Sequence, residues 1–202
     1  MKKYLEIIPD GYREKIANRS RVRYWKGYFV RLLRHLKYSS IRAVARMNGA
    51  QIGEGSILKY RLARHCNQNL IIGNDSIVEA TDLDLRGKII IGNHCIVNGK
   101  VEILRVSHYI KDDRKFTTRY YPPLVVADYC WLATGCKILP SCCNIAENTV
   151  IGAYSVCTKD TVPNSVYSGF PATKLKDKNC RFDDLLVCSL MGGDFDYYKR
   201  IK

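Results

Sequence analysis

The sequence lacks any long hydrophobic run, which limits where the protein can reside. No stretch of about 18 consecutive apolar residues occurs, so we predict no membrane-spanning helix. The opening MKKYLEIIPDGYREK contains only the apolar group YLEII, interrupted by Glu6, whereas a secretory signal needs a run of roughly 7 to 15. We therefore expect a cytoplasmic protein, and 202 residues are enough for one sizeable core with a smaller appendage.

The cysteines lack the pattern of a disulfide scaffold or of a structural zinc site. There are nine, an odd number, and no export signal accompanies them, so we expect reduced thiols. Four of them fall within VADYCWLATGCKILPSCC, at positions 126 to 143, with successive spacings of six, six and one. Structural zinc sites usually bring cysteines in pairs about two to four residues apart, so we expect no metal site.

A period of six residues runs through the same stretch. Apolar residues recur every six positions, with one extra residue in the middle: Val126, Leu132, Ile138, Ile145, Ile151 and Cys157. A small side chain follows each of them by four residues: Cys130, Cys136, Cys142, Thr149, Ser155 and Thr161. Upstream copies begin at Ile72, Ile91, Val97 and Ile103. Such a period predicts a parallel β-helix, in which three short sides make one coil of about 18 residues.

In this β-helix the large aliphatic and the small side chain both point inward. Free Cys behaves as a small hydrophobe, so Cys130, Cys136 and Cys142 are predicted to be buried, reduced and replaceable by Ser, Ala or Val. Cys143 lies beside the one-residue slip and can be exposed. Residues that tolerate positive φ stand where corners are needed: Asn74-Asp75, Asn93-His94, Asn98-Gly99, Thr134-Gly135 and Asn148.

Three segments resemble a known family. They are PLVVADYCWLATGCKILP (123 to 140), VIGAYSVCTKD (150 to 160) and VPNSVYSGFPATKL (162 to 175). They are similar to the hexapeptide-repeat acyltransferases, in the branch of galactoside and maltose acetyltransferases and surface-polysaccharide O-acetyltransferases. The resemblance covers about residues 50 to 175. It implies an all-β core formed by a left-handed parallel β-helix, acetyl-CoA as cosubstrate without a metal, and a homotrimer with active sites between neighbouring coils.

The chain is expected to divide into three parts. Residues 1–48 form a basic helical segment, residues 49–176 form the β-helix acyltransferase domain, and residues 177–202 form a C-terminal helix and tail. The repeat breaks between Ser107 and Pro122, in HYIKDDRKFTTRYYP, which predicts an excursion loop over 108–122. A loop that leaves a rigid coil is a natural substrate-binding element.

His108 stands at the root of this loop, directly after Ser107, the last small inward position. On position alone it would be a surface loop histidine. In the family, however, the catalytic histidine sits at the base of such a loop, some two dozen residues before a Trp, and here 131 − 108 = 23. Imidazole titrates near neutral pH and suits a general base. A backbone carbonyl, Asp112 or Asp113 would orient it, and the sequence does not choose among these.

The other histidines have simpler explanations. His94 lies in the corner segment IGNHC, where the turn accounts for it. His35 and His65 have no partners in the sequence. A carbonic anhydrase on this fold needs three zinc-binding histidines with a close pair, and the nearest two here are His94 and His108.

The resemblance also implies a set of cosubstrate-binding residues: Trp131, Thr134, Ala153, Thr158, Lys159 and Lys176. Lysines near the adenosine end of coenzyme A have an electrostatic reason to be there, because that end carries phosphates. Packing on a strand edge is the alternative role of Trp131. Two positions depart from the family pattern. Thr173 replaces the basic residue that follows Pro-Ala, and Tyr154 replaces a glycine.

The N-terminal segment has a helical period, with apolar residues at three- and four-residue steps: Val22, Trp25, Phe29, Leu32, Leu33 and Leu36. Between Gly11 and Arg46 there are eleven Lys or Arg against Glu14 alone, or 11 − 1 = +10. Helices here would cap the open end of the coil and leave a solvated basic face. The alternative is peripheral contact with an anionic membrane surface. No motif points to nucleic acid.

These inferences favour an acetyl-CoA-dependent O-acetyltransferase that acts on a sugar hydroxyl in bacterial surface-polysaccharide biosynthesis. The alternatives are N-acetylation of a nucleotide-linked amino sugar and a non-catalytic β-helix scaffold that binds an acidic polymer. The sequence does not identify the sugar, its hydroxyl or the acyl group.

Overall fold

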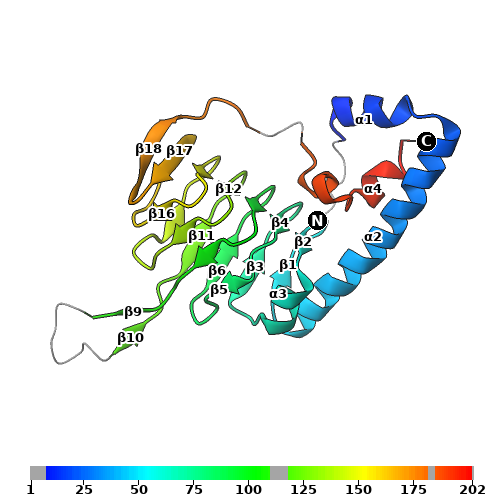
Figure 1. The fold of residues 1–202 in the computed structure, drawn as a ribbon. Coiled ribbons are helices and arrows are strands. Elements are labelled where there is room, and N and C mark those ends of the chain that lie inside the picture. The colour runs from blue at the N-terminus through cyan, green and yellow to red at the C-terminus, as the bar shows by residue number, and fades with distance from the viewer. Residues whose placement is uncertain (1–7, 110–117, 182–184, 202) are drawn as a thin grey trace.

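The computed structural model describes residues 8–109, 118–181 and 185–201. Two helices, α1 (Asp10–Ala17) and α2 (Arg21–Met47), precede a stack of short strands (Figure 1). Among the described residues, no helix has both the length and the hydropathy that crossing a membrane requires. The backbone N–H of Arg23 donates to the side chain of Ser20 at 3.4 Å, which caps the start of α2.

The strands build the three faces of a prism. The first face contains β1 (Gln51–Ile52), β3 (Leu70–Ile72), β6 (Ile89–Ile91), β11 (Leu124–Val126) and β14 (Asn144–Ile145). The second contains β2 (Ile57–Leu58), β4 (Ile77–Val78), β7 (Ile96–Val97), β12 (Trp131–Leu132), β15 (Val150–Ile151), β17 (Ser165–Gly169) and β18 (Ala172–Asp177). The third contains β5 (Asp82–Leu83), β8 (Glu102–Ile103), β13 (Lys137–Ile138) and β16 (Val156–Cys157).

Parallel pairing stacks each coil on the one before it. Val126 lies opposite Ile145 on the first face, and Leu132 lies opposite Ile151 on the second face. Along one coil, Val126 and Leu132 are six residues apart and take equivalent inward positions on successive faces. All four are fully buried. Only the closing pair β17–β18 is antiparallel within the three faces described here. The predicted parallel β-helix of hexapeptide repeats is therefore confirmed.

The corners follow a simple rule. A residue with positive φ directly precedes the buried small side chain, as with Tyr129 before Cys130 and Asn148 before Thr149. The predicted corner Asn98-Gly99 differs in one respect, because the residue with positive φ is Lys100. It stands directly before the inward Val101, so the rule holds at this corner too, one residue later than the sequence predicts.

Small side chains line the corner between the first and second faces as a ladder. Ser76 N donates to Ser56 Oγ at 2.9 Å, and Cys95 N donates to Ser76 Oγ at 2.9 Å. The thiol of Cys130 donates to the carbonyl of Ala146, one coil further on, at 3.1 Å. A hydroxyl or thiol therefore satisfies backbone groups that the corner leaves unpaired.

The four cysteines of the opening stretch behave largely as predicted. Cys130, Cys136 and Cys142 are buried free thiols, which confirms their assignment to the small inward positions. Burial, and after it the neighbouring Cys157, raises the pKa of Cys136 to about 12. Cys143 is half-buried, and its backbone N–H donates to Asp160 Oδ1 at 2.7 Å.

The N-terminal helices cap the first coil. Ile41 and Ala45 of α2 are buried in the same apolar core as Leu62 of α3 (Tyr60–His65), which takes the place of a strand on the third side of that coil. Arg42 Nη1 donates to Ser56 O at 3.2 Å, and Arg46 Nε donates to Ile52 O at 3.1 Å. These bonds satisfy carbonyls at the open edge of the coil.

The C-terminal segment returns to α2 through the short 3-10 helix η3 (Val187–Met191) and α4 (Phe195–Tyr198) (Figure 1). The buried carboxylate of Asp194 accepts from Arg31 Nε at 2.9 Å and from the hydroxyl of Tyr12. The rings of Tyr24 and Tyr198 stack with their centroids 4.9 Å apart. The tail therefore covers the inner side of the part of α2 that projects beyond the coil.

Candidate active site

The excursion loop leaves the prism at the corner between the third and first faces. Its two arms, β9 (Ser107–His108) and β10 (Arg119–Tyr120), pair antiparallel and project from the coil (Figure 1). His108 is half-buried and lies opposite Arg119. Asp112 and Asp113, two candidates for orienting the imidazole, lie outside the described residues.

Arg105 occupies the root of this loop and is fully buried. Its Nη1 donates to Pro123 O at 3.2 Å and to Cys142 O at 3.0 Å, and its Nη2 donates to Leu139 O. Burial lowers the pKa of the guanidinium from its ordinary value. A buried arginine is tolerated only when its donors are satisfied, and here carbonyls from both sides of the loop neck satisfy them.

The sequence analysis missed Arg105 because it assigned the inward position to Ser107. In the structure Ser107 is half-buried in β9, and the chain leaves the coil two residues earlier than the repeat predicts. A charged residue inside a stretch of inward-facing positions was the available signal. The arginine lies three residues before His108 and links the root of the loop to the same corner of the following coil.

Trp131 stands on the second face, between Ile96 and Val150 of the neighbouring coils. Its indole Nε1 donates to Asn98 Oδ1 at 2.7 Å, and 38% of the residue remains exposed. The ring is therefore held in one orientation while part of its surface stays open to a bound molecule.

Thr134 and Ala153 share the corner between the second and third faces, one coil apart. Tyr154 N donates to Thr134 O at 3.0 Å, and both Thr134 and Ala153 are exposed. Tyr154 has φ +55°, and a Cβ on Gly135 would lie 2.5 Å from its ring. The tyrosine that replaces the family's glycine therefore covers part of this corner.

The remaining predicted cosubstrate residues lie at the last coils. Lys176 is exposed on β18, opposite Val166 of β17. Thr158 and Lys159 follow β16, where the carbonyl of Thr158 accepts from Ser141 Oγ at 2.7 Å. Thr173, which replaces the family's basic residue, is exposed on β18 as well.

The structure brings some of these residues together and separates others. Trp131, Thr134 and Ala153 lie along the second face and its corner with the third. His108 lies at the opposite edge of the third face, on the corner from which the loop departs. One chain alone therefore does not place His108 beside Trp131, Thr134 and Ala153.

The other histidines make local contacts. His94 has φ +53°, its Nδ1 lies 3.0 Å from Asp75 Oδ2, and its ring stacks on Tyr129 at 4.9 Å. His65 Nδ1 lies 2.9 Å from Arg61 O. Within residues 8–109, 118–181 and 185–201 no group of three His, Cys, Asp or Glu is placed to hold a metal ion.

Two relatives in sequence bear on this site. The chain is 29% identical over 134 residues to a protein of Escherichia coli K12 named "Putative colanic acid biosynthesis acetyltransferase WcaF", across 66% of this chain and 72% of that one. It is 34% identical over 99 residues to a galactoside O-acetyltransferase of Lactococcus lactis, across 48% of this chain and 44% of that one. No protein-family model matches the chain.

Solved structures agree on the fold. A hexapeptide-repeat acetyltransferase of Vibrio cholerae superposes with a TM-score of 0.57 at 18% identity, across 89% of this chain and all of that chain. A galactoside acetyltransferase in complex with coenzyme A gives 0.51 at 20% identity, across 67% and 68%. Taken with the repeat register, the chain has the fold of the hexapeptide-repeat acetyltransferases, and the sequence relatives that it matches are named acetyltransferases. It is an enzyme of the acyltransferase class.

Proposed function

We propose that this protein is an acetyl-CoA-dependent O-acetyltransferase that acts on a sugar hydroxyl during the biosynthesis of a bacterial surface polysaccharide. The names of the two sequence relatives support the transfer of an acetyl group and the choice of a saccharide as its acceptor. The coenzyme A held by the similar galactoside acetyltransferase structure supports the cosubstrate. The observation that carries the proposal is His108 on a projecting hairpin whose root Arg105 holds.

In the proposed reaction His108 is the general base. Its imidazole takes the proton of the sugar hydroxyl while that oxygen attacks the thioester carbonyl of acetyl-CoA. The tetrahedral intermediate collapses, the carbon–sulfur bond breaks, and the imidazolium returns the proton to the departing thiolate of coenzyme A. Backbone N–H groups in the cleft would stabilise the oxyanion.

Trp131, Thr134, Ala153, Thr158, Lys159 and Lys176 form the proposed cosubstrate groove. The open part of the Trp131 ring and the exposed corner of Thr134 and Ala153 support a contact with the extended pantetheine arm. The exposed ammonium groups of Lys159 and Lys176 support contacts with phosphates.

A homotrimer completes the proposed site, with His108 of one chain facing the cosubstrate groove of another. The separation of His108 from Trp131, Thr134 and Ala153 within one chain supports this arrangement. Exposed apolar side chains on the last coils support an interface there: Tyr154 at 67%, Phe170 at 83% and Leu175 at 64% exposed. The proposed location is the cytoplasm, with peripheral contact at the inner face of the membrane, for which the basic N-terminal helices are the support.

The activity is tested by incubating the purified protein with acetyl-CoA and a panel of sugars while thiol release is followed. Release with hydroxyl acceptors supports the proposal. Release only with amino sugars would favour N-acetylation of a nucleotide-linked sugar, and no release with any acceptor would favour a non-catalytic scaffold.

Sharing of the site between chains is tested by complementation. His108→Ala removes the base, and Ala153→Trp blocks the groove, so each variant alone should be inactive. Co-expressed chains that mix freely should recover about a quarter of the wild-type activity, because that share of sites receives one intact part from each variant. No recovery in verified mixed oligomers would place the complete site within a single chain.

A further inference from the structure

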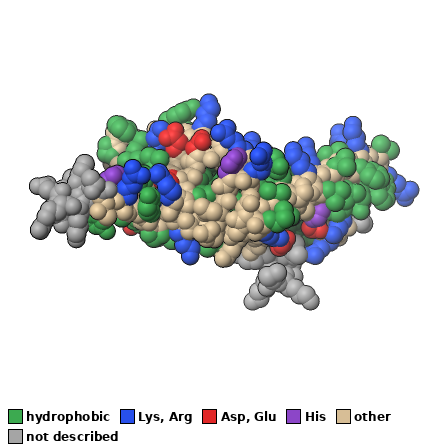
Figure 2. Space-filling model, turned by 90° about the horizontal axis from the view of Figure 1, so that it is seen from below, with side chains coloured by type: hydrophobic (Ala, Val, Ile, Leu, Met, Phe, Trp, Pro, Cys, Tyr) green, Lys and Arg blue, Asp and Glu red, His purple; other side chains and the backbone are tan. Residues whose placement is uncertain are grey.

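The outer face of α2 carries a stripe of exposed apolar side chains. Its members recur at three- and four-residue steps, which places them on one side of the helix. They are Val22, Trp25, Phe29, Leu33 and Leu36, with exposed fractions of 81%, 54%, 59%, 68% and 58%. Figure 2 shows hydrophobic side chains gathered at the end of the molecule that α2 forms, with Lys and Arg around them. Neighbouring exposed apolar residues of this kind mark a surface that binds a partner or a membrane.

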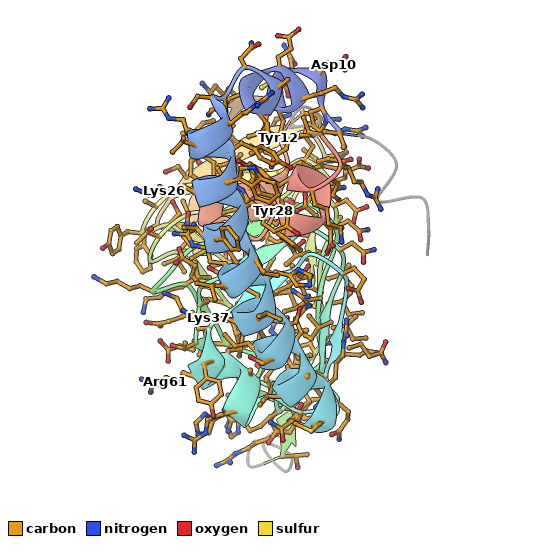
Figure 3. All side chains as sticks on the ribbon, turned by 90° about the vertical axis from the view of Figure 1, so that its right-hand side faces the viewer. Asp10, Tyr12, Lys26, Tyr28, Lys37 and Arg61 are labelled. Carbon is orange, nitrogen blue, oxygen red and sulfur yellow. The ribbon has the colours of Figure 1, made fainter. Side chains whose placement is uncertain are left out.

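The inner face of the same helix is already occupied. Tyr28 packs against Phe195 with ring centroids 5.1 Å apart, and Arg31 pairs with Asp194. In Figure 3, Tyr12 and Tyr28 point toward the C-terminal elements, and α2 lies in front of them with its outer face toward the viewer. The apolar stripe is therefore not part of the contact that holds the tail.

The charge of α2 limits which partner fits the apolar stripe. Its 27 residues include eight Lys or Arg and no Asp or Glu. Lys26 and Lys37 are exposed and lie on the same side of the helix in Figure 3. A second copy of this chain would bring an equally basic helix against the apolar stripe, and the like charges would repel.

An anionic lipid surface matches both features. A helix that lies in the bilayer interface buries an apolar face at the boundary of headgroups and acyl chains and directs Lys and Arg to anionic headgroups. Trp25 has the amphipathic ring that is enriched at this depth. Beside it lies a hollow of about 540 Å³ lined by Arg21, Tyr24, Tyr28 and Lys199, all of them aromatic or basic.

We propose that α2 docks on an anionic lipid bilayer, with the apolar stripe inserted into the interface and Lys26 and Lys37 on the headgroups. This proposal names the helix and the residues that would make the proposed membrane contact. It rests on the proposed function only for its purpose. If the enzyme acetylates a sugar, a docked α2 would hold the coil near acceptors that are carried on a lipid.

Vesicle sedimentation tests the docking without acetyl-CoA or any acceptor, so its outcome is independent of catalysis. The full chain should sediment with vesicles of phosphatidylcholine and phosphatidylglycerol and stay in solution with phosphatidylcholine alone. Lys26→Glu with Lys37→Glu should weaken binding by at least 20-fold, on the basis of about 5-fold for each base lost. Lys88→Glu with Lys100→Glu, at exposed positions of the coil, makes the same charge change and should leave most of the binding.

Insertion is read from fluorescence, because the chain has two tryptophans. In a Trp131→Phe background Trp25 is the reporter, and its emission should shift to the blue with anionic vesicles. Phe29→Ser with Leu33→Ser, which changes exposed side chains of the apolar stripe, should abolish both the shift and sedimentation.

Three results would overturn the proposal. They are equal binding to neutral and anionic vesicles, unchanged binding of the Lys26→Glu, Lys37→Glu variant, and a change of oligomeric state in the Phe29→Ser, Leu33→Ser variant without any vesicle binding by the wild type. The last result would assign the apolar stripe to contact between copies of the chain.

Discussion

The coil and the helical end of this molecule are stabilised by contacts of very different kinds. In the coil each inward side chain stacks on an equivalent residue of the next coil, as Leu132 does on Ile151. In the helical end the decisive contacts join the two termini of the chain, as Arg31 and Asp194 do. A local rule repeated along the chain specifies the first region, whereas a few long-range pairs specify the second.

The largest expected effect is on catalysis, through His108 on the loop of the coil. His108→Ala should lower turnover by about 100- to 10,000-fold, because the general base is lost, while acetyl-CoA still binds. Steady-state kinetics and acetyl-CoA titration on the same preparation measure the two effects. His65→Ala is the matched control and should keep full activity. A folded His108→Ala protein with wild-type turnover would contradict the assignment.

The next effect should be confined to the helical end. Asp194→Asn leaves the guanidinium of Arg31 beside a neutral side chain in a buried site, which should cost about 3 to 5 kcal/mol. Hydrogen exchange should show faster opening of η3 and α4 with little change in the coil. Asp196→Asn removes only partly exposed pairs, with Lys199 and with His35, and should cost less than about 1 kcal/mol. Uniform loss of protection over both regions would show that they unfold together.

A substitution of Arg105 tests whether its bonds to the coil keep the β9–β10 hairpin in position. Arg105→Met leaves the carbonyls of Pro123 and Cys142 without their donor, and the hairpin should then hold His108 less accurately. We expect kcat to fall by about 10- to 100-fold with KM for acetyl-CoA little changed. Arg105→Lys keeps one donor and should recover part of kcat. A lower melting temperature with normal kcat would make Arg105 structural only.

The smallest effect appears at high pH. The thiol of Cys136 has its pKa raised from 9.0 to about 12 by burial, so between these values the unfolded chain loses a proton that the folded chain keeps. Its contribution to stability is complete below pH 9 and is lost as the pH rises toward 12, by at most about 1.4 kcal/mol per pH unit. Urea unfolding at pH 8 and pH 10 should show a smaller pH dependence for Cys136→Ala than for the wild type. Cys180→Ala, at an exposed thiol, is the control and should leave that dependence unchanged.

The coil could be predicted from the sequence because a period of six fixes both the face and the depth of each side chain. The same reasoning gave the burial of Cys130 and the departure of the loop near His108. It could not predict the position of Arg105, because two of the carbonyls that accept from its guanidinium belong to Leu139 and Cys142, more than thirty residues away in the sequence.

The helical end was predictable only as helix. The three- and four-residue period of Val22 to Leu36 marked one apolar side of α2, but the side that the tail covers is formed by Tyr24, Tyr28 and Arg31. No local pattern links these residues to Asp194 or Tyr198, which follow more than 160 residues later. The cosubstrate residues were expected from resemblance, and their roles stay predictions.

The coil closes across the excursion without a break. Ile89 of β6 pairs with Leu124 of β11, and Ile91 pairs with Val126, as if the residues between β8 and β11 were absent. A hairpin inserted at such a seam can change in length or composition while the strands on both sides keep their partners. If this hairpin contacts the acceptor, as proposed, exchange of this one segment would alter acceptor preference while the strand pairing of the coil stays the same.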